Sequence, residues 1–347
     1  MKTLLNKKIR LTFLFLLLCS ASVFGQEFSN PVEYMNFIGE QYAQLTEDQW
    51  AYTRAIANDK KAKKIESKRQ DLLNSNKSAQ AKIKKMPAYN GNTEYRDSVV
   101  AFLQLNYDVL NNDYAKIVDM EEIAEQSYDL MEAYLLAQEV ASEKLKSAGE
   151  MLSETEKKFA ADNDITLQEG EKSKNAKRLE KANKVYKYYN EIYLIFFKCY
   201  KQEAYLLDAV NTGDVNAMEQ NKNALLTYAN EGLDKLKKLK AFEGDNSLIE
   251  AGKEILDFYK DEAENELGDI VDFFVKKEKF ETINEAFEAK KKNKRTQEDV
   301  DNFNQAVNDY NAATEAYNKA NEILNKSRGK KLDNWNNTAT KFTKKNV

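Results

Sequence analysis

Apolar side chains recur along most of the chain in alternating three- and four-residue steps, which place them on one face of an α-helix. The first such segment follows Asn30 and Pro31, a capping residue and a proline suited to the first helical position. Its apolar positions are Met35, Ile38, Tyr42, Leu45, Tyr52 and Ile56. A new helix could begin at Thr46-Glu47-Asp48, because a threonine followed by acids also marks an N-terminus. The pattern predicts a long helix from residue 31.

A broader apolar face occupies "VYKYYNEIYLIFFKCY", residues 185–200. It comprises two adjacent helical stripes: Tyr186, Tyr189, Tyr193, Phe196 and Tyr200, and Tyr188, Ile192, Ile195 and Cys199. A face this wide predicts a helix surrounded by neighbours, although the same aromatic residues could line a groove for a sugar or peptide. Further along, heptad positions of an antiparallel bundle hold Val300, Phe303, Val307, Tyr310, Thr314, Tyr317 and Leu324.

Two stretches repeat each other: "IKKMPAYNGN" at residues 83–92 and "LKKLKAFEGD" at residues 236–245. Residues 72–119 align with residues 225–272 at a constant offset of 153, without a gap. This register predicts an internal duplication. Within it, Gly91 and Gly244 supply the positive φ of a turn between antiparallel helices. The next helix is predicted to be capped by residues 92–93 or 246–247, with Ser247 and Glu250 forming a capping box.

The last helix of each copy aligns at an offset of 179, which places Ala133, Ala137 and Ala141 on Ala312, Ala316 and Ala320. The longer spacing reflects an insertion in the second copy, around "KKEKFETINEAFEAKKKNKRTQED". The predicted fold is all-α, with two tandem antiparallel four-helix bundles; one continuous elongated bundle is the alternative. The predicted divisions are a leader (1–25), a first bundle (26–160), a polar linker (161–177), a second bundle (178–330) and a polar basic tail (331–347).

Residues 1–25 have the pattern of a secretory signal peptide: several basic residues, an apolar run too short to span a bilayer, and small residues before Gln26. Export without a membrane-spanning segment after cleavage is therefore expected. Lipid attachment at Cys19 is not expected, because Leu16-Leu17-Leu18 precedes this cysteine where lipidation needs a small residue. Cleavage leaves 49 basic and 57 acidic side chains, a net charge of −8, which argues against nucleic acid as a partner.

Composition excludes several chemistries. The sequence contains no histidine, so it has no Ser-His-Asp triad, no Cys-His pair and no His-ligated metal site. Cys199, the one cysteine left after cleavage, cannot form an internal disulfide and is interpreted as a small buried apolar residue. We expect no cofactor and no enzymatic activity. An enzyme using only carboxylates, tyrosines and lysines is the least favoured hypothesis.

One group of carboxylates is the candidate metal site. On a helix, Glu121, Glu125, Asp129 and Glu132 fall on one stripe. Such a stripe could provide an all-oxygen site for a hard cation such as calcium, or it could be a solvated flank neutralised by lysines of a neighbouring helix. The second copy has asparagines at three of these positions, so a cation site would belong to the first bundle alone.

Two segments, "WAYTRAIANDKKAKKIESKRQDLL" (Trp50–Leu73) and "EQSYDLMEAYLLAQE" (Glu125–Glu139), resemble a family of uncharacterised helical surface proteins of diderm bacteria. The resemblance implies export to the envelope and an all-helical fold, and it supplies no binding residue. Relatives often have histidine near residues 57–61, where this chain has "ANDKK". We therefore expect an exported helical envelope or surface protein with a protein or glycan partner. The alternative is a solute- or cation-binding bundle.

Overall fold

The computed structural model describes residues 27–58, 61–113, 124–168 and 172–347. These residues are almost entirely helical and include no strand, which confirms the all-α prediction. The expected leader, with Cys19, lies outside them. The α-helices are α1 (Pro31–Ala57), α2 (Ala62–Lys84), α3 (Glu94–Asp108), α5 (Tyr128–Asp162), α6 (Lys174–Thr212), α7 (Val215–Lys238), α8 (Ser247–Asp261), α9 (Leu267–Ala289) and α10 (Gln297–Asn346). Short π-helical segments η1 (Val109–Asp113) and η2 (Glu262–Glu266) follow α3 and α8, and the 3-10 turn η3 (Lys292–Lys294) follows α9.

Capping side chains begin several of these helices. The side chain of Asn30 accepts a hydrogen bond from the backbone N–H of Glu33 at 2.9 Å, ahead of Pro31 at the first helical position. Helix α1 then continues through residues 46–48. The hydroxyl of Thr46 donates to the carbonyl of Tyr42 at 2.8 Å, so it bonds within the helix and does not cap a new one.

The predicted duplication is visible in the element boundaries. Helices α3 and α8 each have 15 residues, and their first residues, Glu94 and Ser247, are related by the offset of 153. Each continues into a five-residue π-helical segment at the same offset. Helices α2 and α7 also begin at positions related by this offset, Ala62 and Val215. The offset found in the sequence is therefore preserved in the backbone.

The repeated turns have the same geometry in both copies. Backbone hydrogen bonds join Tyr89 to Asn92, and Phe242 to Asp245, in both directions. The two central residues have positive φ: 49° and 80° at Asn90 and Gly91, and 49° and 88° at Glu243 and Gly244. Two such residues define a type I′ turn, and the positive φ predicted for both glycines is confirmed.

Of the predicted caps after these turns, Asn92 is confirmed in the first copy, whereas the Ser247–Glu250 capping box of the second copy is wrong. The carboxylate of Asp245 accepts from the backbone N–H of Ser247 at 2.9 Å, and the side chain of Asn92 accepts from that of Glu94 at 2.8 Å. Ser247 is already inside α8, and Glu250 pairs with Lys253 at 2.9 Å, so no capping box forms there. In both copies, the side chain of an Asn or Asp at the end of the turn accepts a hydrogen bond from the backbone N–H two residues later.

A tyrosine from the first helix of each copy closes its turn. The hydroxyl of Tyr34 donates to the carbonyl of Pro87 at 3.1 Å, and that of Tyr188 donates to the carbonyl of Lys240 at 3.0 Å. The two carbonyl positions, 87 and 240, are again equivalent in the duplication. Aromatic packing surrounds both turns: Tyr89 lies against Tyr34 and Phe159, and Phe242 lies against Tyr188 and Phe342.

Gly244 provides a test of the turn. Its φ of +88° is a conformation that a Cβ disfavours, so Gly244→Ala should lower the free energy of unfolding by about 1–2 kcal/mol. Gly329, inside α10 with open space around a Cβ, is the matched control: Gly329→Ala should raise it by about 0.5–1 kcal/mol. Urea unfolding followed by circular dichroism measures both. Equal effects of the two substitutions would contradict the turn assignment.

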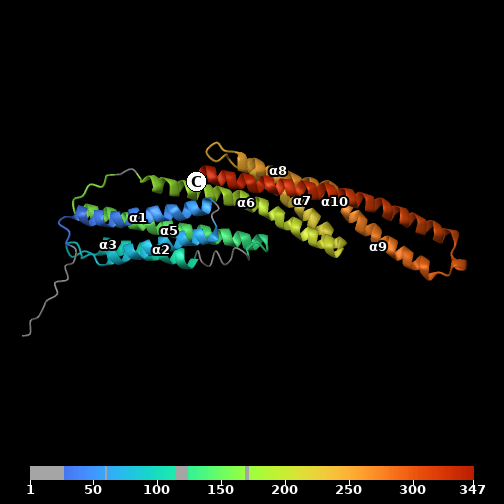
Figure 1. The fold of residues 1–347 in the computed structure, drawn as a ribbon, viewed down its shortest axis with the longest axis horizontal. Helices are drawn as coiled ribbons and strands as arrows, with labels where there is room; N and C mark the ends of the chain where they lie inside the picture. Colours follow the sequence, from blue (N-terminus) through green and yellow to red (C-terminus); the bar gives the residue numbers. More distant parts are fainter. Residues whose placement is uncertain (1–26, 59–60, 114–123, 169–171) are drawn as a thin grey trace, which may run out of the picture.

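The described residues form two apolar cores along an elongated molecule (Figure 1). One core lies among α1, α2 and α3 and includes Ile83, Val99 and Leu103. The other lies among α6, α7, α8 and α10. Helix α5 contributes to both, with Phe159 in the first core and Met131 in the second. The predicted polar linker falls between α5 and α6, where residues 163–168 and 172–173 are not helical, and the division of the chain at residue 160 stays a prediction.

The predicted basic tail, residues 331–347, is instead the last third of α10. Trp335, Ala339 and Phe342 are buried in the second core, because they recur at helical spacing and pack toward α6 and α8. The lysines of this segment lie around these buried residues: Lys331 is directed at Glu254 of α8, and Lys345 pairs with Asp245.

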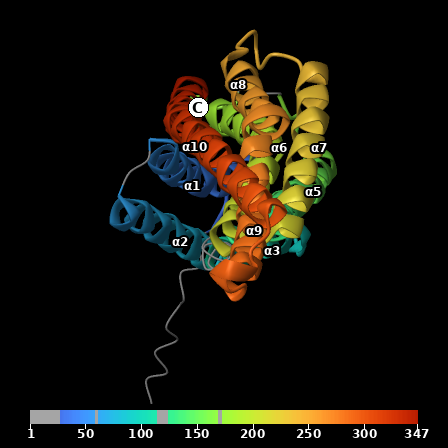
Figure 2. The same ribbon diagram turned by 90° about the vertical axis from the view of Figure 1, so that its right-hand side faces the viewer.

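The predicted insertion forms the far end of a hairpin made by α9 and the first turns of α10, seen end-on in Figure 2. Aromatic rings bridge the two helices: Phe280 stacks on Tyr310 at 5.2 Å, and Phe287 stacks on Phe303 at 4.5 Å. The basic loop at residues 290–295 closes the tip, where Arg295 donates to the carbonyl of Phe287 at 3.0 Å. In the part of the chain described, none of the helices combines the length and apolarity needed to cross a bilayer.

Candidate functional site

Two residues of the predicted carboxylate set, Asp129 and Glu132, lie in the first turns of α5, and Glu125 precedes the helix. Glu121 is outside the described residues, and the other three, Glu125, Asp129 and Glu132, are exposed. Ser127 caps the helix by accepting from the backbone N–H of Leu130 at 3.2 Å. The hydroxyl of Tyr128 donates to Glu132 at 3.0 Å; burial, followed by this bond, raises the pKa of Tyr128 to about 12. Across the described residues, no group of three or more acids and cysteines is arranged to hold a metal ion.

The outer face of α5 carries an unusual run of exposed apolar side chains. Leu136, Val140 and Met151 are 58%, 56% and 63% exposed. They are separated by four and eleven positions, close to one and three whole helical turns, so they share one face. We call these three residues the α5 stripe. Helix α5 packs mainly against α3 and α6, which leaves this side uncovered by the described residues.

The duplication provides an internal comparison for the α5 stripe. At the offset of 179, residues 136, 140 and 151 correspond to Glu315, Lys319 and Lys330 of α10, all of which are also exposed. The register is sound, because Ala141 and its counterpart Ala320 are both buried. The same solvent-facing positions are thus charged in one copy and apolar in the other. The helix itself does not require an apolar side chain at any of them.

Acids line one edge of the stripe. Glu132, Glu139, Glu143 and Glu150 are exposed and fall on the same side of Leu136 at helical spacing. We call these four residues the acidic edge. Glu139 pairs with Lys187 of α6 at 2.7 Å, and Glu150 lies 3.9 Å from Lys146. Residues 125–154 contain seven acids and two lysines, so this segment of the chain carries a net charge of −5.

A second feature is buried in the other half of the molecule. Arg328 of α10 donates to Glu203 of α6 and, at 2.8 Å, to Glu262 at the start of η2. The side chains of Glu203 and Glu262 are 3% and 0% exposed. We call these three residues the buried cluster. One guanidinium therefore faces two carboxyl groups away from water.

Burial favours the protonated form of one carboxyl in the buried cluster. Burial raises the pKa of Glu262 to about 9, and the charge of Glu203 raises it further, while Arg328 opposes the shift. The Oε2 atom of Glu262 receives no hydrogen bond from a described group. Burial similarly raises the pKa of the adjacent Cys199 thiol to about 12, and Cys199 is fully buried as predicted.

Sequence reasoning missed the buried cluster, although a signal was present. At the offset of 153, Glu262 corresponds to Val109, which begins η1 and is 0% exposed. A glutamate at the position of a buried valine marks a polar group inside the core. The aromatic residues that precede the cluster on α6 mostly pack in the core: Phe196 and Phe197 are buried, and Tyr193 stacks on Phe197 at 5.5 Å.

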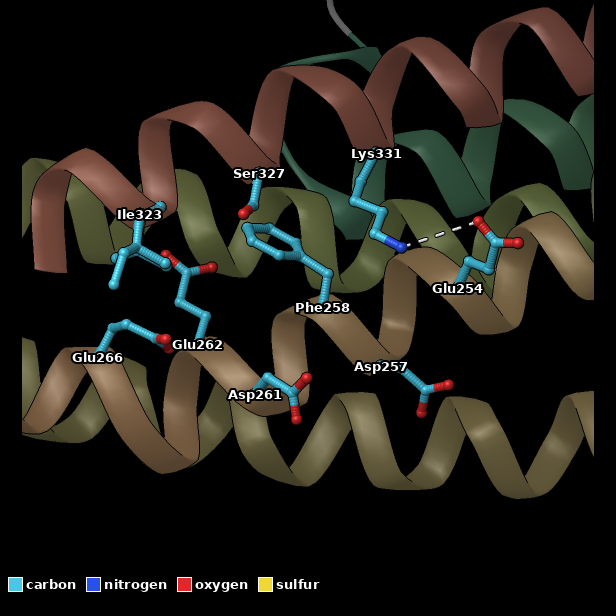
Figure 3. A pocket seen from close by; sticks show the side chains of 10 residues that line it. Glu254, Asp257, Phe258, Asp261, Glu262, Glu266, Ile323, Ser327 and Lys331 are labelled. Atoms are coloured by element: carbon cyan, nitrogen blue, oxygen red, sulfur yellow. Dashed lines mark ion pairs between the residues drawn. The ribbon is translucent and has the colours of Figure 1, made fainter.

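A pocket of about 270 Å³ lies beside the buried cluster, between α8 and α10 (Figure 3). Figure 3 shows Glu262 pointing toward α10 between Phe258 and Ile323, with Lys331 directed at Glu254, 3.8 Å away. The remaining lining residues are Asp257, Asp261, Glu266, Leu324 and Ser327. Glu262 lines this pocket and also accepts a hydrogen bond from Arg328, so the pocket borders the buried cluster.

A second pocket, of about 300 Å³, lies where α1 and α10 end. It is lined by Trp50, Arg54, Ala57, Asn58, Arg178, Lys344 and Val347. The guanidinium of Arg178 lies 5.3 Å from the centre of the Trp50 ring. Helix C-termini carry partial negative charge, which accounts for cations at this place.

Comparisons with protein-family models, with curated proteins and with solved structures find no match for this chain. Of its features, the α5 stripe is directed at solvent, whereas the buried cluster is enclosed.

Proposed function

We propose that the protein is an exported helical protein of the bacterial envelope or surface that acts without catalysis, by binding another protein through the outer face of α5. One observation carries the proposal: three apolar side chains line up in solvent on α5, where the duplicated helix has charged residues. Isolated exposed apolar residues are common on surfaces, but aligned ones favour an interface.

Support for the location comes from the sequence. The signal-peptide pattern of residues 1–25 and the resemblance of Trp50–Leu73 and Glu125–Glu139 to helical surface proteins both favour export. The absence of histidine supports a role that needs no histidine-dependent catalysis. Two cores joined by long helices would give such a protein a rigid body for presenting a helical face.

The alternative function, binding of a solute or cation, depends on Glu121, Glu125, Asp129 and Glu132. The three of these that the structure describes are exposed, and Glu132 accepts a hydrogen bond from Tyr128. A hard cation prefers several oxygen ligands that surround it. The exposed positions favour protein binding over this alternative.

Site-specific photo-crosslinking in cells tests the proposal. A photoreactive amino acid at Val140 should give one adduct of defined mass, because Val140 lies in the middle of the α5 stripe. The matched control places the same amino acid at Lys319, the corresponding position of α10, where we expect no such adduct. Adding Leu136→Glu and Met151→Lys to the Val140 protein should reduce the adduct at least tenfold. Equal crosslinking from positions 140 and 319 would contradict the proposal.

A further inference from the structure

The geometry of the α5 stripe fits a helix better than a flat or irregular partner. The stripe runs from Leu136 through Val140 to Met151, a rise of about 22 Å along α5. A second helix lying along α5 can contact Leu136 and Val140 on adjacent turns and Met151 three turns further on. Recognition of an amphipathic helix uses anchors three, four and seven residues apart, and Leu136 and Val140 have the four-residue spacing. The occupant therefore needs an apolar row of at least four turns.

The charge beside the α5 stripe restricts the occupant further. The acidic edge runs parallel to the stripe, and residues 125–154 carry a net charge of −5. A helix that covers the stripe places one of its flanks against this edge. Lysines or arginines on that flank would be attracted, and acids would be repelled. In the corresponding stretch of α10 the stripe positions are themselves charged, so the combination of apolar row and acidic edge is specific to α5.

A second copy of this chain fits poorly on the same face. Packing α5 on α5 would bring together two segments that each carry a net charge of −5. Like charges across an interface are unfavourable. An anionic lipid surface is disfavoured for the same reason. The charge therefore favours a foreign, basic partner.

We infer that the α5 stripe and its acidic edge form a docking surface for an amphipathic helix of a partner protein, with its lysines or arginines along one flank. This inference depends on the proposed function and specifies the partner class. The apolar row provides the contact area, and the acidic edge sets the orientation of the incoming helix and accelerates its association at low salt.

A peptide titration tests the inference. The probe is a labelled helical peptide of leucine and lysine, about five turns long, with leucines at helical spacing. In the control peptide, every lysine is replaced by glutamate. Fluorescence anisotropy with the purified protein should show saturable binding of the lysine peptide, at least tenfold tighter than that of the glutamate peptide. Raising the salt from about 50 to about 300 mM should weaken this binding, because the acidic edge is exposed.

Two variants locate the binding. The triple variant Leu136→Glu, Val140→Lys, Met151→Lys, which copies the residues of α10, should lose at least tenfold in affinity. The matched control Val275→Glu, Ile323→Lys removes two other apolar residues, 43% and 41% exposed on α9 and α10, and should bind as the wild type does. The melting temperatures of both variants should stay close to that of the wild type, since all five residues are exposed.

Other outcomes would overturn the inference. These are equal binding by the triple variant, equal affinity for the two peptides, dimerisation through α5 in analytical ultracentrifugation, or binding to phosphatidylglycerol vesicles that the triple variant loses. A crosslinked partner at Val140 that is not a basic helix would contradict the inference and would still agree with the proposed function. Absence of any adduct at Val140 in cells would count against the proposed function itself, whatever the peptides do.

Discussion

Replacing Arg328 by methionine should lower the free energy of unfolding by about 3–5 kcal/mol at pH 7, a large fraction of the stability of a typical domain. The substitution keeps most of the side-chain length but removes the cation that faces Glu203 and Glu262. Glu203 is then buried without its partner, and desolvation of an unpaired carboxylate is costly. Urea unfolding followed by circular dichroism measures the loss.

The control for this experiment removes the whole buried cluster. Glu203→Leu and Glu262→Val, combined with Arg328→Met, leave no charge without a partner, and the valine is the residue found at the corresponding position 109. Well-packed apolar replacements of a buried ion cluster are often neutral or stabilising. The triple variant should therefore recover most of the stability lost in the single variant. If it is as unstable as Arg328→Met, lost packing and not lost charge explains the effect.

The helices and the turns could be predicted because their signals are local and repeated. Apolar spacing located α1, α6 and α10, and the two glycines required a positive φ that few other residues adopt. The constant offset between the two copies added a second, independent reading of the same elements. Agreement between local pattern and long-range repeat is what made these predictions reliable.

Other features depended on contacts that local patterns do not show. A serine followed three residues later by glutamate matches a capping box, but Asp245 captures the backbone N–H of Ser247 first. The lysines near the end of the chain favoured the prediction of a polar tail, although Trp335 and Phe342 are buried there. Their burial depends on where α10 lies against α6 and α8. The shared role of α5 in both cores likewise follows from packing between helices.

The candidate site was predictable in part. The spacing of the acids near the start of α5 predicted a set of metal ligands, but Glu125, Asp129 and Glu132 are exposed to solvent in the structure. The apolar residues beside them can be recognised as a candidate interface only when their exposure is known, because the sequence also allows Leu136 to face a core. Comparison of the two copies then distinguishes the positions: an exposed charged residue in α10 shows that the corresponding apolar residue in α5 has no structural need to be apolar. Duplication thus supplies a control that a single bundle lacks.

Stability should fall as pH rises from 5 to 8, and Glu262 should cause most of the fall. Its pKa rises from an ordinary value of 4.5 to about 9 in the folded protein. Between these values the folded state binds one more proton than the unfolded state, so each pH unit lowers the free energy of unfolding by about 1.4 kcal/mol. From pH 5 to pH 8 the contribution of this residue is therefore about 4 kcal/mol. It is fully present below pH 4.5 and is lost as pH rises toward 9.

Glu262→Gln isolates this effect, because glutamine keeps an acceptor for Arg328 but does not titrate. Urea unfolding at pH 5, 6.5 and 8 should give a flatter profile for the variant, and its advantage over the wild type should grow with pH. Glu254→Gln, an exposed residue of the same pocket, is the matched control and should keep the wild-type slope. The window avoids Asp245, whose pKa is lowered mainly by its hydrogen bond to Lys345 and which therefore changes stability at more acidic pH. Parallel profiles for the wild type and Glu262→Gln would show that Glu262 is already ionised in the folded protein, with Arg328 balancing both carboxylates.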